Sequence, residues 1–244
     1  MVSILEMYRR AQTGPIVSEK DFQVKTLLPK AEELAKEYGV VRDPEELIPT
    51  DLKLGKAILD AALVFLEERG LWCSDTSRII KLTRTEIKDT LRAIPSEQEF
   101  GAGEDRVTIK HRDIGDKRPA TNYLGAWGSG HTSAELFLKV NQSFAQEPID
   151  MLQNGPLMNV KGRRVRINTP DEIYAVALAS RLLREAGRRA GRPDMPIGFD
   201  CLAMTDIAHP AILTPGGARP TDHWTVSSVY PCSTVKLTTW NRAA

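Results

Sequence analysis

The sequence has 244 residues, of which 41% are hydrophobic and 27% are charged, with 33 basic against 32 acidic side chains. This is the composition of an ordinary soluble globular protein, long enough to bury a core and to form one or two domains. A net charge of +1 gives no bulk electrostatic reason to expect a nucleic acid or an anionic membrane as a partner.

Cysteine usage and hydropathy indicate the compartment. Cys73, Cys201 and Cys232 are far apart and odd in number, which argues against a disulfide framework or a structural zinc site and favours a reducing compartment. The N-terminus has no signal-peptide core, and the longest apolar cluster, at 57–66, is broken by Asp60 and too short to span a membrane. We therefore expect a cytoplasmic protein.

Three helices are predicted in the first hundred residues. A capping-box pattern starts at Ser18 and precedes apolar residues at helical spacing. A second helix is expected from Asp51 to Gly70, and a third begins at Thr83, with a glutamate three residues further on. Residues 1–99 are therefore predicted to form a mostly helical N-terminal segment.

Strand patterns begin after Phe100. Residues 105–112 alternate between apolar and polar side chains like a half-buried strand. The runs 157–160 and 164–167 flank Lys161-Gly-Arg163, which predicts a hairpin. The basic stretch around this turn fits a solvated hairpin or, alternatively, a nucleic-acid patch.

The best local helix signal is Thr169-Pro-Asp-Glu172, which combines an N-cap, a proline at the first helical position and a capping-box glutamate. The helix is expected to end near Gly191 and to feed a short apolar strand around Gly198. Two further strand-like runs follow at 224–230 and 234–237. This order favours an α/β region after the helical segment.

Several side chains of this late region are candidate functional groups. His223 follows Asp222 beside a Gly-Gly loop, so this pair could move a proton, or it could simply form a turn. Asp200 and Asp206 could bind a cationic amine or cap helices and turns. No two histidines have the i, i+4 spacing of a helical zinc site, and we expect no metal.

A series of ordered motifs resembles the monomethylamine:corrinoid methyltransferase family. The most specific is Gly70-Leu-Trp-Cys-Ser-Asp-Thr-Ser-Arg-Ile-Ile-Lys81, followed by a helix start at Thr83. The similarity is collinear from about residue 8 to residue 217. Its other elements are Ile48–Asp51, Phe100–Asp105, Asp116–Pro119, Val160–Gly162, Ala190–Pro193 and Met195.

The resemblance implies a helical N-terminal segment that leads into a TIM-type (β/α)8 barrel, of which residues 100–244 are the incomplete start. It implies transfer of a methyl group from monomethylamine, or a related methylated amine, to the Co(I) corrinoid of a small partner protein. The chain itself then binds no cofactor directly. The family forms homo-oligomers of longer chains and carries pyrrolysine, whose ring imine takes up the amine.

This sequence departs from the family at the residues that matter for chemistry. Gly198 falls at the pyrrolysine position and Thr225 stands where the family has glutamate. The resemblance also implies that the chain is a truncated member. Without an electrophile, a quaternary ammonium donor fits, because positive charge already activates its methyl group. Asp200, Asp222 and Trp224 are the nearest candidates to bind such a cation.

Two alternatives stay open. In the first, the chain is an inactive fragment or an interaction module of the same family, acting through its helical N-terminal half. In the second, it is an unrelated TIM-like enzyme that uses Asp222 and His223 as acid and base.

Overall fold

The computed structural model describes residues 2–47, 49–113, 115–125, 133–199, 202–223, 229–230 and 233–237. These form two compact units. The first unit comprises the chain up to Ile94 together with the late strands β10 (Val229–Tyr230) and β11 (Thr234–Val235). The second begins at Pro95 and contains the remaining described residues.

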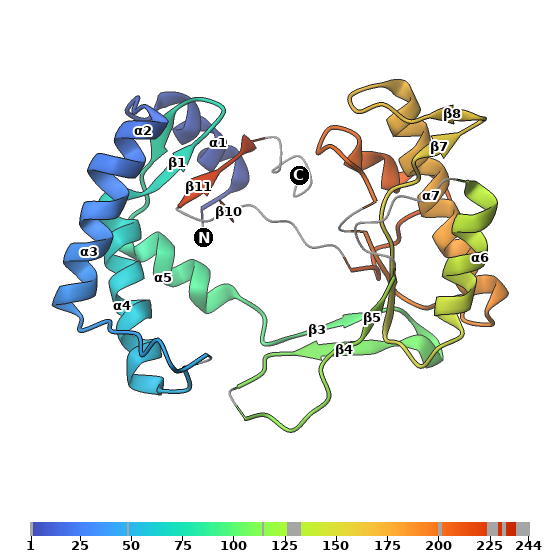
Figure 1. The fold of residues 1–244 in the computed structure, drawn as a ribbon, viewed down its shortest axis with the longest axis horizontal. Helices are drawn as coiled ribbons and strands as arrows, with labels where there is room; N and C mark the ends of the chain where they lie inside the picture. Colours follow the sequence, from blue (N-terminus) through green and yellow to red (C-terminus); the bar gives the residue numbers. More distant parts are fainter. Residues whose placement is uncertain are drawn as a thin grey trace. The chain divides into compact units, whose positions relative to one another are not determined.

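Helices dominate the first unit (Figure 1). The predicted start at Ser18 is confirmed, since the Ser18 hydroxyl accepts a hydrogen bond from the Asp21 N–H at 3.1 Å. The helix continues through a π-helical stretch, η1, and ends before Gly39, whose φ of 63° suits a glycine. The helices of this unit are α1 (Ile4–Thr13), α2 (Glu19–Asp21), η1 (Phe22–Leu27), α3 (Leu28–Glu37), α4 (Leu52–Arg69) and α5 (Arg84–Ala93).

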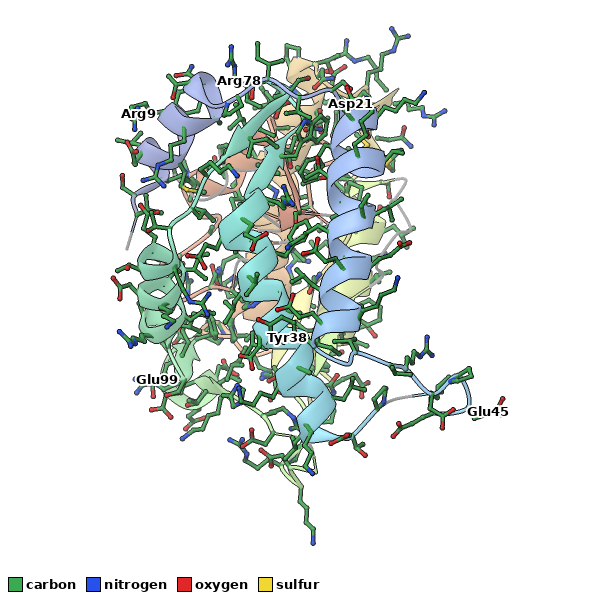
Figure 2. All side chains as sticks on the ribbon, turned by 90° about the vertical axis from the view of Figure 1, so that its left-hand side faces the viewer. Arg9, Asp21, Tyr38, Glu45, Arg78 and Glu99 are labelled. Atoms are coloured by element: carbon green, nitrogen blue, oxygen red, sulfur yellow. The ribbon has the colours of Figure 1, made fainter. Side chains whose placement is uncertain are left out.

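Helices α3 and α4 lie side by side, and Figure 2 shows α3 ending at Tyr38 along the face of α4. Leu34 of α3 is buried against Ala61 and Phe65 of α4. The amphipathic spacing predicted from the sequence therefore places its apolar stripe where the two helices meet.

A small sheet completes the first unit, in the order β10, β11, β1 (Leu71–Cys73), β2 (Arg78–Ile80). Strand β1 pairs with β2 as an antiparallel hairpin and with β11 in parallel. The sequence pattern predicted the end of a helix at Gly70 but no strands after it, so β1 and β2 were missed. Trp72 stacks on Phe22 with ring centroids 6.1 Å apart, and its indole N–H donates to the Val17 carbonyl at 2.9 Å.

An ion pair joins α1 to the start of α5. The predicted capping box at Thr83 is confirmed, and its glutamate, Glu86, also accepts hydrogen bonds from Arg10 at 2.6 and 3.0 Å. The Arg10 guanidinium, helped by the Thr83 backbone N–H, lowers the pKa of Glu86 from 4.5 to about 2.

This pKa shift predicts an acid sensitivity of the first unit. Because the pKa is depressed in the folded state, the stabilisation by Glu86 is present above pH 4.5 and is lost as the pH falls towards 2. In urea titrations, Glu86→Gln should unfold more easily than the wild type near neutral pH, and this difference should shrink on acidification. A difference that is constant with pH would contradict the assignment.

The second unit holds a hairpin and a parallel sheet. Strands β3 (Glu97–Phe100) and β4 (Val107–Lys110) are antiparallel around η2 (Gly103–Asp105), so the strand predicted at 105–112 is confirmed. Strands β5 (Tyr123–Leu124), β6 (Met151–Gln153) and β9 (Ile197–Gly198) form a parallel sheet in that order. The predicted hairpin is β7 (Asn159–Val160) with β8 (Arg163–Arg164), and the remaining helices are α6 (Ala134–Ala145), α7 (Pro170–Arg189) and η3 (His209–Leu213).

The main core lies where α6 and α7 cover one face of this parallel sheet. Phe137, Leu152, Leu183 and Ile197 are all buried in it. The mixed α/β class predicted from the sequence is therefore confirmed, and no closed barrel is present among the described strands. Within the described ranges, no helix is both long and apolar enough to cross a membrane.

The capping box predicted at the start of α7 is wrong in detail. Thr169 makes no side-chain cap to the helix, and its hydroxyl instead donates to the Arg166 carbonyl at 2.7 Å. The carboxylate of Glu172 accepts from the Asn168 N–H and from the Thr205 N–H, each at 2.7 Å. The glutamate thus ties the beginning of α7 to the segment that follows β9, which the sequence pattern alone did not indicate.

Candidate functional site

The carboxyl ends of the parallel strands bring three residues into one row. Gln153 is the register partner of Gly198, and Gly198 forms a parallel bridge to His223. The His223 N–H donates to the Ile197 carbonyl at 3.0 Å, and the Phe199 N–H donates to the His223 carbonyl at 3.2 Å. Two sequence-predicted residues, Gly198 and His223, are therefore neighbours at the edge where α/β proteins commonly bind ligands.

Alternation along the strands separates this row from the core. Leu152 and Ile197, one residue earlier in each strand, face the helices and are buried. Successive side chains point to opposite faces of a sheet, so Gln153 and His223 lie on the face away from the helices. Both are half-buried.

Aromatic rings surround the His223 imidazole on this face. Its ring contacts Phe100 edge-on at 5.1 Å between centroids and Tyr123 at 5.5 Å. Phe100 is buried, whereas Tyr123 is 37% exposed. A cation near these rings would meet the negative faces of π-systems.

Gln153 is a candidate that the sequence interpretation missed. A Cβ atom built on Gly198 would lie 3.2 Å from the Gln153 Oε1 and 3.3 Å from its Cβ, so this carboxamide occupies the space beside the glycine. The Gln153 carboxamide itself makes no hydrogen bond to any side chain or backbone group within the described ranges. The available signal was a polar residue directly after the apolar pair Met151-Leu152.

The segment after Gln153 is fixed by two buried amides. Asn154 donates to the Asn141 Oδ1 at 2.7 Å, and Asn141 donates to the Phe137 carbonyl at 2.7 Å. Both asparagine side chains are fully buried. They anchor the carboxyl end of β6 to α6, which holds Gln153 in place.

Asp222 makes contacts that differ from those of its neighbour His223. Its Oδ1 accepts from the Ile197 N–H at 3.0 Å, and its Oδ2 accepts from the Arg219 N–H at 2.7 Å and from the Arg184 guanidinium. The Asp222 side chain is 3% exposed and the Arg184 side chain is 11% exposed. Burial lowers the pKa of Arg184, and the charge of Asp222 opposes this effect.

The other predicted site residues, Asp200, Trp224 and Thr225, lie outside the described residues. Within the described ranges, no three His, Cys, Asp or Glu side chains come together as a possible metal site. The described part of the candidate site therefore consists of Gln153, Gly198 and His223, with the rings of Phe100 and Tyr123 beside them.

Parallel strands joined by helices, with polar groups at their carboxyl ends, define an α/β protein with the site layout common among α/β enzymes. The chain belongs to the monomethylamine methyltransferase MtmB family, whose model matches residues 2–232.

Relatives and solved structures agree with this family. Monomethylamine methyltransferase MtmB2 of Methanosarcina acetivorans is 31% identical over 225 residues, which cover 92% of this chain and 49% of the relative. Monomethylamine methyltransferase MtmB of Methanosarcina mazei is 34% identical over 193 residues, covering 79% and 42%. The crystal structure of the Methanosarcina barkeri enzyme superimposes with a TM-score of 0.88 at 30% identity, covering 98% of this chain and 52% of that chain. The chain thus spans about half the length of the relatives it matches.

Proposed function

We propose that this chain takes part in moving a methyl group from monomethylamine, or a related methylated amine, to the Co(I) corrinoid of a partner protein. The observation that carries the proposal is that the family match runs through residues 2–232 and includes the row Gln153, Gly198, His223. We also propose that the parallel strands are the first part of a (β/α)8 barrel. The contact between Tyr123 and His223, which belong to the first and fourth segments of the sheet, supports this because a curved sheet brings such side chains together.

The chemistry sets two requirements for the chain's own residues. The Co(I) acceptor supplies the nucleophile for the methyl carbon, and the C–N bond breaks with its electron pair going to nitrogen. The nitrogen must therefore carry a positive charge before transfer, so that a neutral amine or ammonia leaves. The residues around Gly198 must bind this cation and orient its methyl group.

Gln153 and the rings beside His223 suit these requirements better than Asp222 does. A carboxamide oxygen can accept an N–H hydrogen bond from methylammonium, and aromatic faces attract ammonium cations of any substitution. The Asp222 oxygens already accept three hydrogen bonds on the core side of the sheet. We propose that Asp222 is a positioning residue, and that His223, not Asp222, faces the substrate.

The experiment is a methyl-transfer assay with purified chain, Co(I) corrinoid protein and either methylammonium or tetramethylammonium, followed by the cobalt absorbance. Gln153→Ala should lower kcat/KM for methylammonium about tenfold, in line with the loss of a hydrogen bond to a charged group. The rate with tetramethylammonium, which has no N–H to donate, should stay unchanged. Gln153→Glu serves as the control that retains an acceptor oxygen.

Each outcome has a distinct meaning. Absence of methylation with every amine would reject the enzyme function, whereas an equal fall with both amines would reject only the role of Gln153. The absence of a side chain at Gly198 favours one second candidate, a non-catalytic member of the family. Binding of the corrinoid protein without any methyl transfer would support that candidate.

A further inference from the structure

A concentrated positive charge lies on the β7–β8 hairpin and the residues that follow it. We call residues 159–167 the basic hairpin, because Lys161, Arg163, Arg164 and Arg166 are all exposed there. The whole chain has a net charge of only +1, so this local excess is not a consequence of composition. It borders a surface hollow of about 780 Å³ that is lined by Arg163, Arg164, Val165, Arg166, Thr169 and Asp171.

Two of these cations are used within the chain. Arg163 pairs with Asp171 at 2.7 Å, and the Lys161 ammonium lies 4.8 Å from the centre of the Tyr174 ring. Arg164 and Arg166 form no ion pair with any residue that the structure describes. Two guanidinium groups are thus left available for an external anion.

Contacts of Val165 anchor the backbone of the basic hairpin between these two arginines. The Val165 N–H donates to the Met158 carbonyl at 2.8 Å, and the Val165 side chain is buried in the main core. Alternation then turns Arg164 and Arg166 to the opposite, solvent side. An anchored backbone lowers the cost of ordering this segment on binding, and only the two arginine side chains then lose conformational freedom.

The topology places the basic hairpin at the same edge as the candidate site. It connects the carboxyl end of β6, where Gln153 lies, to the start of α7, and Figure 1 shows it beside the beginning of that helix. The hydrogen bonds from Thr205 to Glu172 independently tie the start of α7 to the segment after β9. A macromolecule that reaches Gly198 must approach this edge.

We propose that the basic hairpin is a docking surface for an acidic face of the corrinoid-carrying partner. This inference rests on the proposed function, because it requires a partner that delivers its acceptor to this edge. Complementary charge steers such an encounter and raises its rate more than it tightens the final complex. A nucleic acid is the less favoured occupant, because the chain as a whole has no basic excess.

The test measures association of the full chain with immobilised, cobalamin-loaded corrinoid protein by biolayer interferometry. The double variant Arg164→Gln with Arg166→Gln should associate about tenfold more slowly at low ionic strength and should approach the wild type in high salt. Arg164→Lys with Arg166→Lys should keep the wild-type rate. The matched control, Arg188→Gln with Arg189→Gln, removes the same charge at the far end of α7 and should have no effect.

An unchanged association rate in the Gln double variant would overturn the docking surface and leave the methyl-transfer proposal intact. If the lysine double variant associates as slowly as the glutamine double variant, positive charge does not explain the docking. No binding by the wild-type chain would reject both proposals. Binding of a duplex DNA oligonucleotide that depends on Arg164 and Arg166 would assign the hairpin to nucleic acid instead.

Discussion

Replacing Asp222 with alanine should lower the free energy of unfolding by about 3–5 kcal/mol, because removing one partner of a buried ion pair leaves the other charge uncompensated. The substitution leaves the Arg184 guanidinium, 11% exposed, without its carboxylate. It also removes the acceptor for the Ile197 and Arg219 backbone N–H groups. Urea titration followed by circular dichroism measures the effect.

Two further variants test whether the destabilisation by Asp222→Ala comes from leaving the buried charge of Arg184 unpaired. Asp194→Ala removes the partner of Arg219 in an exposed pair at 3.3 Å and should cost less than about 1 kcal/mol. The double variant Arg184→Ala with Asp222→Ala should cost less than the sum of the single variants, because no buried charge is then left alone. If the losses in free energy of unfolding from the two single substitutions simply add in the double variant, Arg184 and Asp222 are not energetically coupled.

Trp72→Ala should destabilise the first unit by about 3–5 kcal/mol, since it deletes a large buried aromatic side chain. Trp72 is 4% exposed and packs against Phe22 and Ile79. The substitution also removes the hydrogen bond from the Trp72 indole to the Val17 carbonyl. This bond fixes the segment before α2. Thermal and urea unfolding monitored by far-ultraviolet circular dichroism report the loss.

Trp72→Phe is the matched control. A phenylalanine retains a ring to face Phe22 but cannot donate to the Val17 carbonyl, so the expected cost is about 1–3 kcal/mol, that of an unsatisfied buried acceptor. If alanine and phenylalanine cost the same, the hydrogen bond rather than the burial of the ring would account for the stability.

Helix starts were predictable because their signals are local. Ser18 and Thr83 each accept from a backbone N–H three residues away, and this pattern is visible in the sequence. The helix start at Thr169-Pro170 was predicted as well, but its capping box does not form, because Glu172 instead accepts from Thr205, 33 residues away. Strand β1 was missed for a similar reason: it is three residues long, and one of its partners, β11, lies far along the chain.

The candidate site was predictable only in part. Gly198 and His223 were identified, but their neighbourhood depends on the parallel register between β6, β9 and the segment at 223. No pattern within one segment specifies that register, so Gln153 could not be associated with Gly198. Likewise, the sequence pairs Asp222 with His223, whereas alternation sends their side chains to opposite faces.

The parallel pairing of β1 with β11 has a consequence for the order of events on the ribosome. The Ser74 N–H donates to the Val235 carbonyl, 161 residues later in the chain. At a synthesis rate of 5–20 residues per second, Val235 is made roughly 8–32 s after Ser74. Throughout that interval β1 has an open edge, and Leu71, Cys73 and Ile80 lack the buried Val235 that completes their cluster. Residues 95–223 of the second unit are therefore synthesised before β11, the strand that completes the sheet of the first unit.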